Sequence, residues 1–207
     1  MGDNEIIIVG NGVGIRSVDC YNWTSFKHNG FDGGWYKPQV AAGDNKIVIT
    51  CYNTGGLISS IDNGSTWSRN EPFNTYWSGV AFGNHTFAII AGNMRSAVIR
   101  NTDTITNITW EDGTHIYDSP NLNRDPGKVC FNNNTFYCFS AYRESNLYSY
   151  SDDGLNWNAV YFPKNVYVGY YGSNTPTFGA NGEMYFVNSL DRSIWRNPTP
   201  KQGDTWE

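Results

Sequence analysis

Residues 59–67, SSIDNGSTW, place serines, an aspartate and a threonine directly before a tryptophan. A carboxylate beside hydroxyl groups is a combination used in acid–base and nucleophilic catalysis, so Asp62 is the first candidate for a reactive residue. The same residue types also build turns, because an aspartate side chain accepts hydrogen bonds from backbone N–H groups further along the chain. Whether the stretch occurs once or several times separates the two interpretations.

The stretch belongs to a series of five. Tryptophans occur at positions 23, 67, 110, 157 and 206, after SVDCYNW, SIDNGSTW, NTDTITNITW, YSDDGLNW and the looser NPTPKQGDTW. Copies at one repeated position favour a structural role over a catalytic one, because a reactive carboxylate needs a particular partner in a cleft. We assign the turns to Asp19, to Asp62 with Gly64 and Trp67, to Asp103, and to Asp152 with Gly154 and Trp157.

The elements that must position these turns repeat with them. The segments GDNEIIIV, GDNKIVIT, GNHTFAII, NNNTFYCF and ANGEMYFV begin at residues 2, 43, 83, 132 and 180. Each is an Asn/Gly/Asp turn followed by a short β-branched or aromatic run, which is typical of a tight hairpin. Before four of them stand QVAAG, GVAFG, KVCFN and PTFGA, so one unit reads as four antiparallel strands.

Four strands per unit and a period of 40–49 residues predict an all-β fold, a five-bladed β-propeller. We expect a single domain over residues 1–207, with units of about 1–35, 36–77, 78–124, 125–172 and 173–207. The first blade lacks its first strand in this numbering. We therefore expect the chain to be a segment of a longer protein, whose further residues complete that blade.

Residues 60–67, SIDNGSTW, resemble the Asp-box, the S-x-D-x-G-x-T-W (BNR-like) repeat of sialidases, sortilin-type receptors and many phage tail proteins. The resemblance implies that the aspartate and glycine shape the turn, and that the tryptophan covers the space between neighbouring blades. It also implies that the turns lie on the side away from the binding centre. The pattern of these repeats is similar to that of propeller domains in phage tail, receptor-binding and other virion surface proteins.

The opposite side should therefore carry any ligand site. Loops after the second strand of three units contain Arg95, Arg143 and Arg192, which could bind a carboxylate or sulfate, although three solvated loop arginines remain the simpler alternative. The connections between blades are rich in aromatic residues, which suit sugars and protein partners alike. Our candidate ligand-binding residues are Trp35, Tyr36, Arg95, His115, Tyr142, Arg143, Tyr171 and Arg192.

Two segments of the chain resemble sequence motifs of enzymes. Glycines at positions 10, 12 and 14 follow a short strand as in a dinucleotide-binding loop, but no helix pattern follows them. The segment NRDPGKV, with Asp125, resembles the Arg-Asp-Pro motif of five-bladed glycosidases. Those enzymes need three carboxylates around a central pocket, and the partner motifs of that family are missing here. We expect no enzyme activity, no cofactor and no metal site.

Composition excludes several classes of function. The chain has a formal net charge of −5 and only 14 Lys and Arg, which disfavours nucleic-acid binding. No run of about 18 apolar residues predicts membrane insertion, and the N-terminus lacks the features of a secretory signal. Cys20, Cys51, Cys130 and Cys138 show no metal-ligand spacing, and we expect them to be reduced.

The sequence therefore predicts a non-enzymatic binding module that recognises a cell-surface glycan or protein, as part of a phage tail fibre or virion surface protein. Partners would be a receptor and other virion or fibre proteins, and oligomerisation would come through the parent protein. The expected location is the virion surface or the extracellular space. A structural propeller that joins other proteins, and a glycoside hydrolase remnant, remain the alternatives.

Overall fold

The computed structural model describes residues 5–10, 12–28, 38–51, 57–70, 77–91, 96–100, 111–112, 126–140, 147–163, 176–188, 191–202 and 206–207. Every regular element in these ranges is a β-strand, and the strands form five antiparallel sheets that follow one another along the chain. The all-β prediction is confirmed. None of the described segments is a helix long and apolar enough to cross a membrane.

The strands pair in chain order within every sheet. Sheet 1 consists of β1 (Ile6–Val9), β2 (Val13–Ser17) and β3 (Thr24–Lys27). Sheet 2 consists of β4 (Gln39–Gly43), β5 (Lys46–Thr50), β6 (Leu57–Ser60) and β7 (Ser68–Asn70). Sheet 3 consists of β8 (Trp77–Gly83), β9 (Thr86–Ala91), β10 (Ser96–Arg100) and β11 (Glu111–Asp112). Sheet 4 consists of β12 (Pro126–Asn132), β13 (Thr135–Ser140), β14 (Leu147–Ser151) and β15 (Asn158–Tyr161).

Sheet 5 consists of β16 (Thr177–Phe178), β17 (Met184–Val187) and β18 (Ile194–Asn197). Glu207 continues this sheet, because its backbone N–H and C=O both bond to Arg196 of β18, at 2.9 and 2.8 Å. Three sheets thus have four strands as the repeat predicted. Within the described ranges, sheet 1 begins with the strand that corresponds to β5, β9, β13 and β17, as the sequence pattern also predicted.

The Asn/Asp turns form three nearly identical hairpins. Both central residues have positive φ in each: 50° and 60° at Asp44 and Asn45, 47° and 55° at Asn84 and His85, and 46° and 59° at Asn133 and Asn134. Positive φ at both residues of a two-residue loop is typical of the type I′ turn, whose twist matches that of the flanking strands. Asn and Asp tolerate this region because their short polar side chains bond locally.

Sheet 4 buries its two faces against different neighbours. Phe136 and Cys138 of sheet 4 pack against Ala88 and Ile90 of sheet 3 in one apolar cluster. In a second cluster, Met184 and Phe186 of sheet 5 pack against Tyr137 and Phe139 of sheet 4. Alternate residues of one strand therefore face the preceding and the following sheet, as the two-residue period of a strand requires.

Glycines at the hairpins allow the sheets to approach closely. A Cβ atom on Gly43 would lie 2.0 Å from the Phe82 ring of the next sheet, and one on Gly83 would lie 2.2 Å from the ring of Phe131. No side chain fits at such distances, so each ring lies directly over a glycine. The G-V-A-F-G pattern in the sequence thus encodes contacts between neighbouring sheets as well as a strand.

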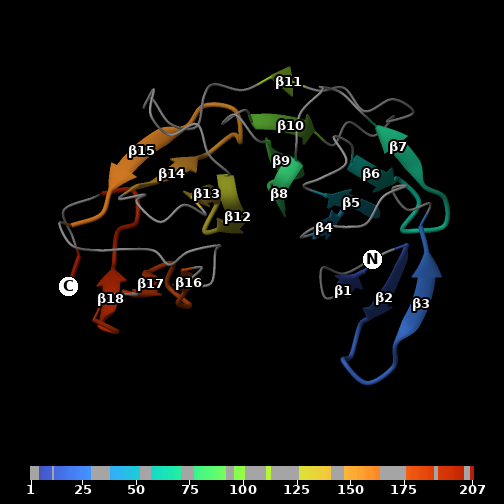
Figure 1. The fold of residues 1–207 in the computed structure, drawn as a ribbon, viewed down its shortest axis with the longest axis horizontal. Coiled ribbons are helices and arrows are strands. Elements are labelled where there is room, and N and C mark those ends of the chain that lie inside the picture. The colour runs from blue at the N-terminus through green and yellow to red at the C-terminus, as the bar shows by residue number, and fades with distance from the viewer. Residues whose placement is uncertain are drawn as a thin grey trace.

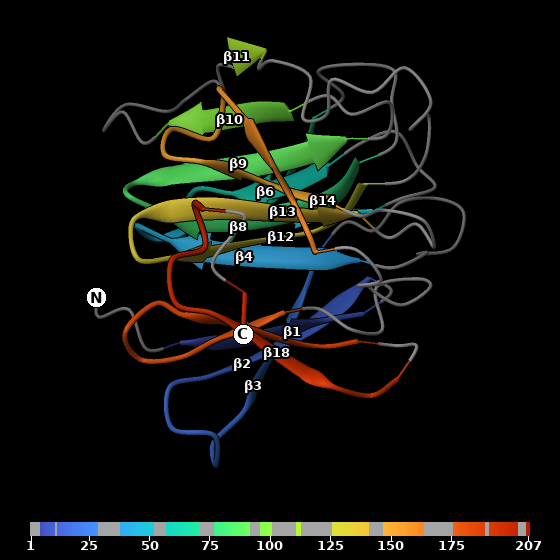
Figure 2. The same cartoon turned by 90° about the vertical axis from the view of Figure 1, so that its left-hand side faces the viewer.

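The five sheets are arranged along an arc, with sheet 1 and sheet 5 at its two ends (Figure 1). Strands β4, β8 and β12 line the inner side of the arc and contact one another in that order. Viewed from the side, the hairpins β8–β9 and β12–β13 turn at the same side of the molecule (Figure 2). No strand pairing joins sheet 5 to sheet 1 among the described residues.

The four cysteines form no disulfide, as expected. Cys138 lies opposite Val129 and Cys130 lies opposite Tyr137, so the two thiols point to opposite faces of one sheet. Burial raises the pKa of the Cys130 thiol to about 12, which keeps this thiol protonated and unreactive.

Candidate functional site: the Asp-turns and the face that carries them

The turn at Asp62 is held together by the side chains of Ser60 and Asp62. The Ser60 hydroxyl donates to Asp62 Oδ1 at 2.8 Å and accepts from the Gly64 N–H at 2.7 Å. The Asp62 carboxylate also accepts from the N–H and the hydroxyl of Thr66, at 2.8 and 2.6 Å. The indole N–H of Trp67 donates to the carbonyl of Gly64. These contacts agree with the structural role predicted for Asp62, Gly64 and Trp67.

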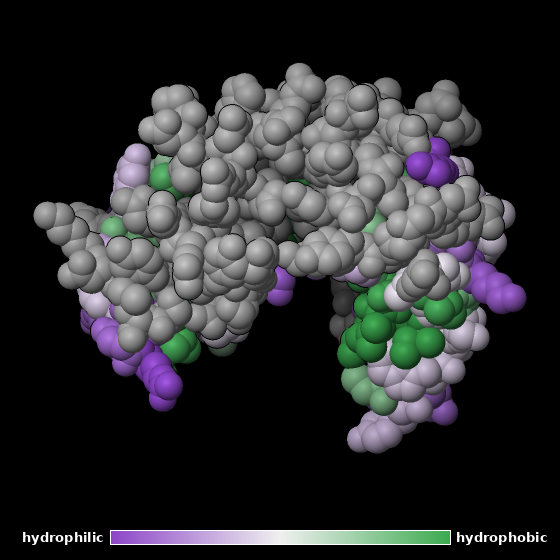
Figure 3. All heavy atoms as spheres, viewed as in Figure 1, coloured by the Kyte–Doolittle hydropathy of each residue, from purple (hydrophilic) through white to green (hydrophobic). Residues whose placement is uncertain are grey.

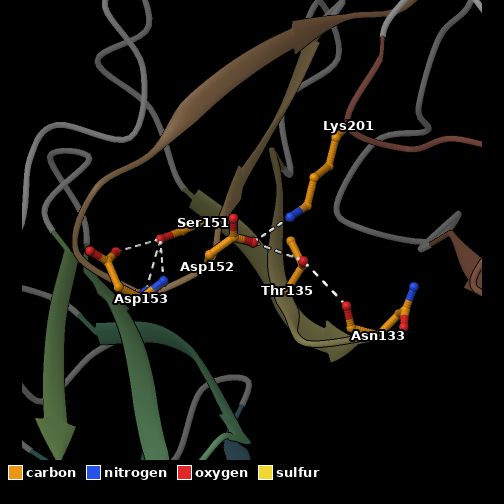
Figure 4. Close-up of polar contacts among 7 residues, drawn as sticks. Asn133, Thr135, Ser151, Asp152, Asp153 and Lys201 are labelled. Atoms are coloured by element: carbon orange, nitrogen blue, oxygen red, sulfur yellow. Dashed lines mark hydrogen bonds and ion pairs between the residues drawn. The ribbon is translucent and has the colours of Figure 1, made fainter.

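The fourth turn corrects the sequence assignment of its aspartate. The carboxylate that organises this turn belongs to Asp153, which accepts from Ser151 and from the N–H groups of Leu155 and Asn156. Asp152 instead accepts from the Thr135 hydroxyl at 2.9 Å and pairs with Lys201 of sheet 5 at 2.5 Å (Figure 4). Gly154 and Trp157 take the expected places, with the indole N–H bonded to the glycine carbonyl.

Asp153 takes this place instead of Asp152 because the turns differ in length. Counted from the serine that ends the preceding strand, the aspartate is always the second residue: Ser17 and Asp19, Ser60 and Asp62, Ser151 and Asp153. The fourth turn is one residue shorter than the second between aspartate and glycine. The serine spacing was present in the sequence and would have identified Asp153.

The first and fifth turns use other residues for the same geometry. Cys20 has a φ of 64° at the place where Gly154 has 76° in the fourth turn, and its carbonyl accepts the indole N–H of Trp23. In sheet 5 the buried Asn197 replaces the serine, and its side-chain oxygen accepts the N–H of Thr199 at 2.8 Å. Asp103, assigned to the third turn, lies outside the described residues.

These hydrogen bonds keep the turn carboxylates ionised. Contacts from the side chain and N–H of Thr66 lower the pKa of Asp62 to about 2. Partial burial alone would raise the pKa of Asp153, but hydrogen bonds from Asn156, Leu155 and Ser151 outweigh it and lower the pKa to about 2. The N–H and side chain of Asn22 lower the pKa of Asp19 in the same way. None of the three carboxyls can supply a proton near neutral pH.

Within the described ranges, Trp67, Trp157 and Trp206 pack against side chains of neighbouring sheets. Trp67 of sheet 2 stacks on Phe26 of sheet 1, with ring centroids 5.5 Å apart. Trp157 packs against the cluster shared by sheets 3 and 4, and Trp206 packs against Tyr148 and Phe162 of sheet 4. Each of these rings faces the preceding sheet. Trp23 of sheet 1 is 39% exposed.

Polar contacts link successive sheets near the turns. Arg16 of sheet 1 donates to the carbonyl of Asn63 at 2.6 Å, and His85 of sheet 3 bonds to Asp44 of sheet 2 at 2.8 Å. The Lys201–Asp152 pair joins sheets 5 and 4. The backbone of Asn63 also bonds to Asn45, so the Asp-turn and the first hairpin of sheet 2 lie together. We call the side formed by the Asp-turns and these hairpins the turn face.

Of the predicted ligand-binding residues, the structure describes Arg192 alone. It lies in the β17–β18 connection with an exposed side chain and a φ of 62°, and its N–H donates to the Asn188 carbonyl. The neighbouring Asp191 accepts from the N–H and hydroxyl of Ser193, which lower the pKa of Asp191. Seven predicted residues lie outside the described ranges: Trp35, Tyr36, Arg95, His115, Tyr142, Arg143 and Tyr171.

The described residues include no group of three or more His, Cys, Asp or Glu side chains that could hold a metal ion. The carboxylates noted above are instead engaged by hydroxyl groups, backbone N–H groups and single cations. In the described ranges, the turn face therefore contains polar contacts that fix turns and join sheets.

No family model matches the chain, and no curated protein sequence matches it significantly. Solved structures do resemble it. The chain superposes on virginiamycin B lyase from Staphylococcus aureus with a TM-score of 0.69 and 15% identity, over 98% of this chain and 65% of the lyase chain. It superposes on YCF48 bound to D1 peptide with a TM-score of 0.66 and 13% identity, over 97% of this chain and 61% of YCF48.

A structure of a nidogen/laminin complex is also similar, with a TM-score of 0.64 and 14% identity, over 95% of this chain and 74% of that one. The chain thus spans less than two thirds of the lyase and YCF48 chains. These neighbours are β-propellers of different functions. At such low identity they establish the fold alone, and the chain has a β-propeller fold.

Proposed function

We propose that this propeller is a non-catalytic binding module, which recognises a cell-surface glycan or protein through the loops on the side opposite the turn face. The supporting observation is the engagement of Asp19, Asp62 and Asp153. Each carboxylate accepts several hydrogen bonds from its own turn, and its pKa is lowered. The most regular carboxylate motif of the chain thus stabilises the scaffold, and recognition falls to the remaining loops.

The composition of those loops suits contact with a ligand. Trp35 and Tyr171 offer flat apolar surfaces with polar edges, and Arg143 offers a planar set of donors for carboxylate or sulfate groups. Each contact is weak on its own. Several copies of the module on one particle would raise the overall strength of binding.

The proposal is tested by glycan-array and cell-binding measurements on the 207-residue chain. Trp35→Ala and Arg143→Ala should each weaken binding tenfold or more. Lys201→Ala removes an exposed side chain of the turn face and serves as the matched control, with binding unchanged. Loss of binding in the control alone would place the site on the turn face and contradict the proposal.

A structural propeller that joins proteins is the second candidate. It is favoured by neighbours solved with partners: YCF48 is bound to D1 peptide, and nidogen is in a complex with laminin. The two candidates differ in their ligand. Binding to a defined protein, together with no glycan bound at millimolar concentration, would support the assembly role.

A glycosidase remnant is the third candidate, based on Asp125 in NRDPGKV, a residue outside the described ranges. Turnover of chromogenic glycosides by the chain, and its loss in Asp125→Ala, would support it. Placement on a phage tail fibre or virion surface is likewise a proposal, supported by the similarity of the Asp-turn repeats to those of such proteins. Immunogold labelling of purified particles tests it.

The five-bladed ring predicted from the repeat is also a proposal, supported by five successive sheets along one curve. In a Cys20→Ser background, cysteines at Ile8 and Val187 place one thiol on each end of the arc. A short thiol cross-linker should join them within one chain if the ring closes. Cross-linking between chains alone would exclude closure.

A further inference from the structure

The first sheet exposes residues that are buried at the same positions of every other sheet. Ile6 lies opposite Ser17, the serine of the first Asp-turn, just as Ile47 lies opposite Ser60 and Phe136 opposite Ser151. Ile6 is 43% exposed and Ile8, two residues on, is 51% exposed. Their counterparts are at most 3% exposed: Ile47 and Ile49, Phe87 and Ile89, Phe136 and Cys138, Met184 and Phe186.

An inner strand pairs with both counterparts in sheets 2, 3 and 4, and with Met184 in sheet 5. In sheet 3, Phe82 lies opposite Phe87 and Val80 lies opposite Ile89. In sheet 4, Phe131 lies opposite Phe136 and Val129 opposite Cys138. In sheet 2, Ala42 lies opposite Ile47 and Val40 lies opposite Ile49, and in sheet 5 Phe178 lies opposite Met184. The residue directly before Ala42, Phe82, Phe131 and Phe178 is small or short in every sheet, namely Ala41, Ala81, Cys130 and Thr177.

No described strand pairs with the inner edge of β1, and the neighbouring strand β4 is correspondingly less covered. Val40 and Ala41 are half-buried and Ala42 is exposed, whereas Val80 and Ala81 are 5% and 7% exposed. Strand β8 lies between β4 and β12, which cover it from both sides. Strands β1 and β4 are in contact, so a strand added at the inner edge of β1 would lie beside the less covered side of β4.

We propose that the inner edge of β1 binds an extended antiparallel strand with the pattern Val–small–Phe. The phenylalanine would lie opposite Ile6, the small residue opposite Ile7 and the valine opposite Ile8. Sheet 1 exposes the hydrophobic side chains of Ile6, Ile8 and Val13, and a hydrophobic surface lies at this end of the arc (Figure 3). The inference goes beyond the proposed function, because it concerns an edge of the sheet and not the ligand-binding loops.

Two physical terms would stabilise the added strand. Alternate N–H and C=O groups of β1 point away from β2, and a partner strand supplies their hydrogen bonds. The valine and phenylalanine would cover the apolar side chains of β1, as they do in sheets 3 and 4, while the short residue permits close approach to β4. This is strand addition with specificity from alternate side chains.

The test uses the 207-residue chain and a peptide with the sequence of residues 77–84, WSGVAFGN, which carries the pattern. Binding should slow hydrogen exchange in β1 and shift the NMR signals of Ile6–Val9. A peptide with Ala81→Pro should bind at least tenfold more weakly, because proline has no N–H and does not fit an interior strand position. A peptide with Phe82→Ala should also bind more weakly.

Variants of the protein locate the site. Ile8→Lys should weaken peptide binding tenfold or more, and Ile8→Ala should weaken it to a lesser extent. Val187→Lys is the matched control, because Val187 is 44% exposed on sheet 5, and it should leave binding unchanged. Circular dichroism spectra should show that all three variants are folded.

Three results would overturn the inference. They are absence of binding at millimolar peptide, equal binding of the proline peptide, and protection that appears in β16–β18 and not in β1. Self-association of the chain that Ile8→Lys abolishes, without peptide binding, would assign the edge to a second copy and also contradict the proposal.

Discussion

Two adjacent carboxylates in the fourth turn perform different tasks. Asp153 accepts hydrogen bonds from its own turn and shapes it, whereas Asp152 binds Thr135 and Lys201 and links two sheets. The tasks follow from position, because side chains of consecutive residues point in different directions at the end of a strand. An aspartate beside a glycine is therefore a weaker indicator of the turn than an aspartate two residues after a serine.

Asp153→Ala should lower the melting temperature more than Asp152→Ala. The first substitution leaves the N–H groups of Leu155 and Asn156 without their acceptor, and we expect a decrease of about 5 °C. The second removes an exposed ion pair and one acceptor of the Thr135 hydroxyl, which retains the Asn133 carbonyl, and we expect a decrease of about 1 °C. Differential scanning calorimetry measures both values. Equal decreases would contradict the division of tasks.

The Asp62 turn should make stability depend on pH in the acid range. The pKa of Asp62 is about 2 in the folded chain, against an ordinary value of 3.8. Its ionised form therefore adds stability above about pH 4, and this contribution is lost as the pH falls towards 2. Asp62→Asn cannot titrate, so its urea midpoint should fall less than that of the wild type between pH 4 and pH 2. An unchanged fall in the variant would show that another group is responsible.

The sequence predicted the residues of the regular turns but not the substitutes that replace them elsewhere. Asp19, Asp62 and Trp67 lie where the repeat placed them, because the serine spacing and the tryptophan are regular there. Cys20 was not recognised as the substitute for glycine, since a positive φ at a cysteine leaves no signal in the sequence. The pair between Asp44 and His85 joins different repeats and was equally invisible.

At the scale of strands and sheets, the hairpin glycines set the distance between neighbours. Gly43→Ala should destabilise the chain strongly, because the new Cβ would lie 2.0 Å from the Phe82 ring. Gly10→Ala is the matched control, since its Cβ would meet only the Val13 carbonyl at an ordinary 3.7 Å. Urea unfolding should give a clearly lower midpoint for the first variant and nearly the wild-type midpoint for the second.

A second substitution checks the cause. Phe82→Leu removes the ring that meets Gly43, so the double variant should lose less stability than the sum of the two single variants. Strict additivity would mean that Gly43→Ala acts through the backbone and not through the contact between sheets 2 and 3.

The strands and hairpins were the most predictable elements of the fold. Asn and Gly punctuate short apolar runs, and local turn chemistry determines where each hairpin lies. The sequence predicted that neighbouring sheets pack on one another, but not which residues are in contact. That Phe131 lies over Gly83, or that Arg16 reaches Asn63, depends on contacts between repeats, which a periodic pattern does not specify.

For the whole molecule, the repeat predicted a propeller, and the structure and its neighbours agree. The number of blades in a closed ring depends on the small angle between successive sheets, to which every interface contributes. No single residue encodes that angle. The predicted ligand site stays a prediction, because seven of its eight residues lie in segments outside the described ranges.

The sheets should also differ in their resistance to local unfolding. Strands β5, β9 and β13 are buried on both faces, with side chains such as Ile47, Ile89 and Phe136 fully covered, whereas β1 exposes Ile6 and Ile8. The free energy of local opening follows buried contacts and protected hydrogen bonds. Native-state hydrogen exchange should therefore show sheet 1 opening first, at a lower free energy than sheets 2 to 4.

Trp67→Ala provides the decisive comparison, because the Trp67 ring stacks on Phe26 and lies beside the buried His28, both in sheet 1. Its loss should accelerate exchange in β2 and β3 while the amides of β13 keep their protection. A similar acceleration in sheets 1 and 4 would mean that the arc unfolds as one cooperative unit, with its end sheet as firmly attached as its centre. The expected gradient arises because an end sheet packs against one neighbour, and each inner sheet packs against two.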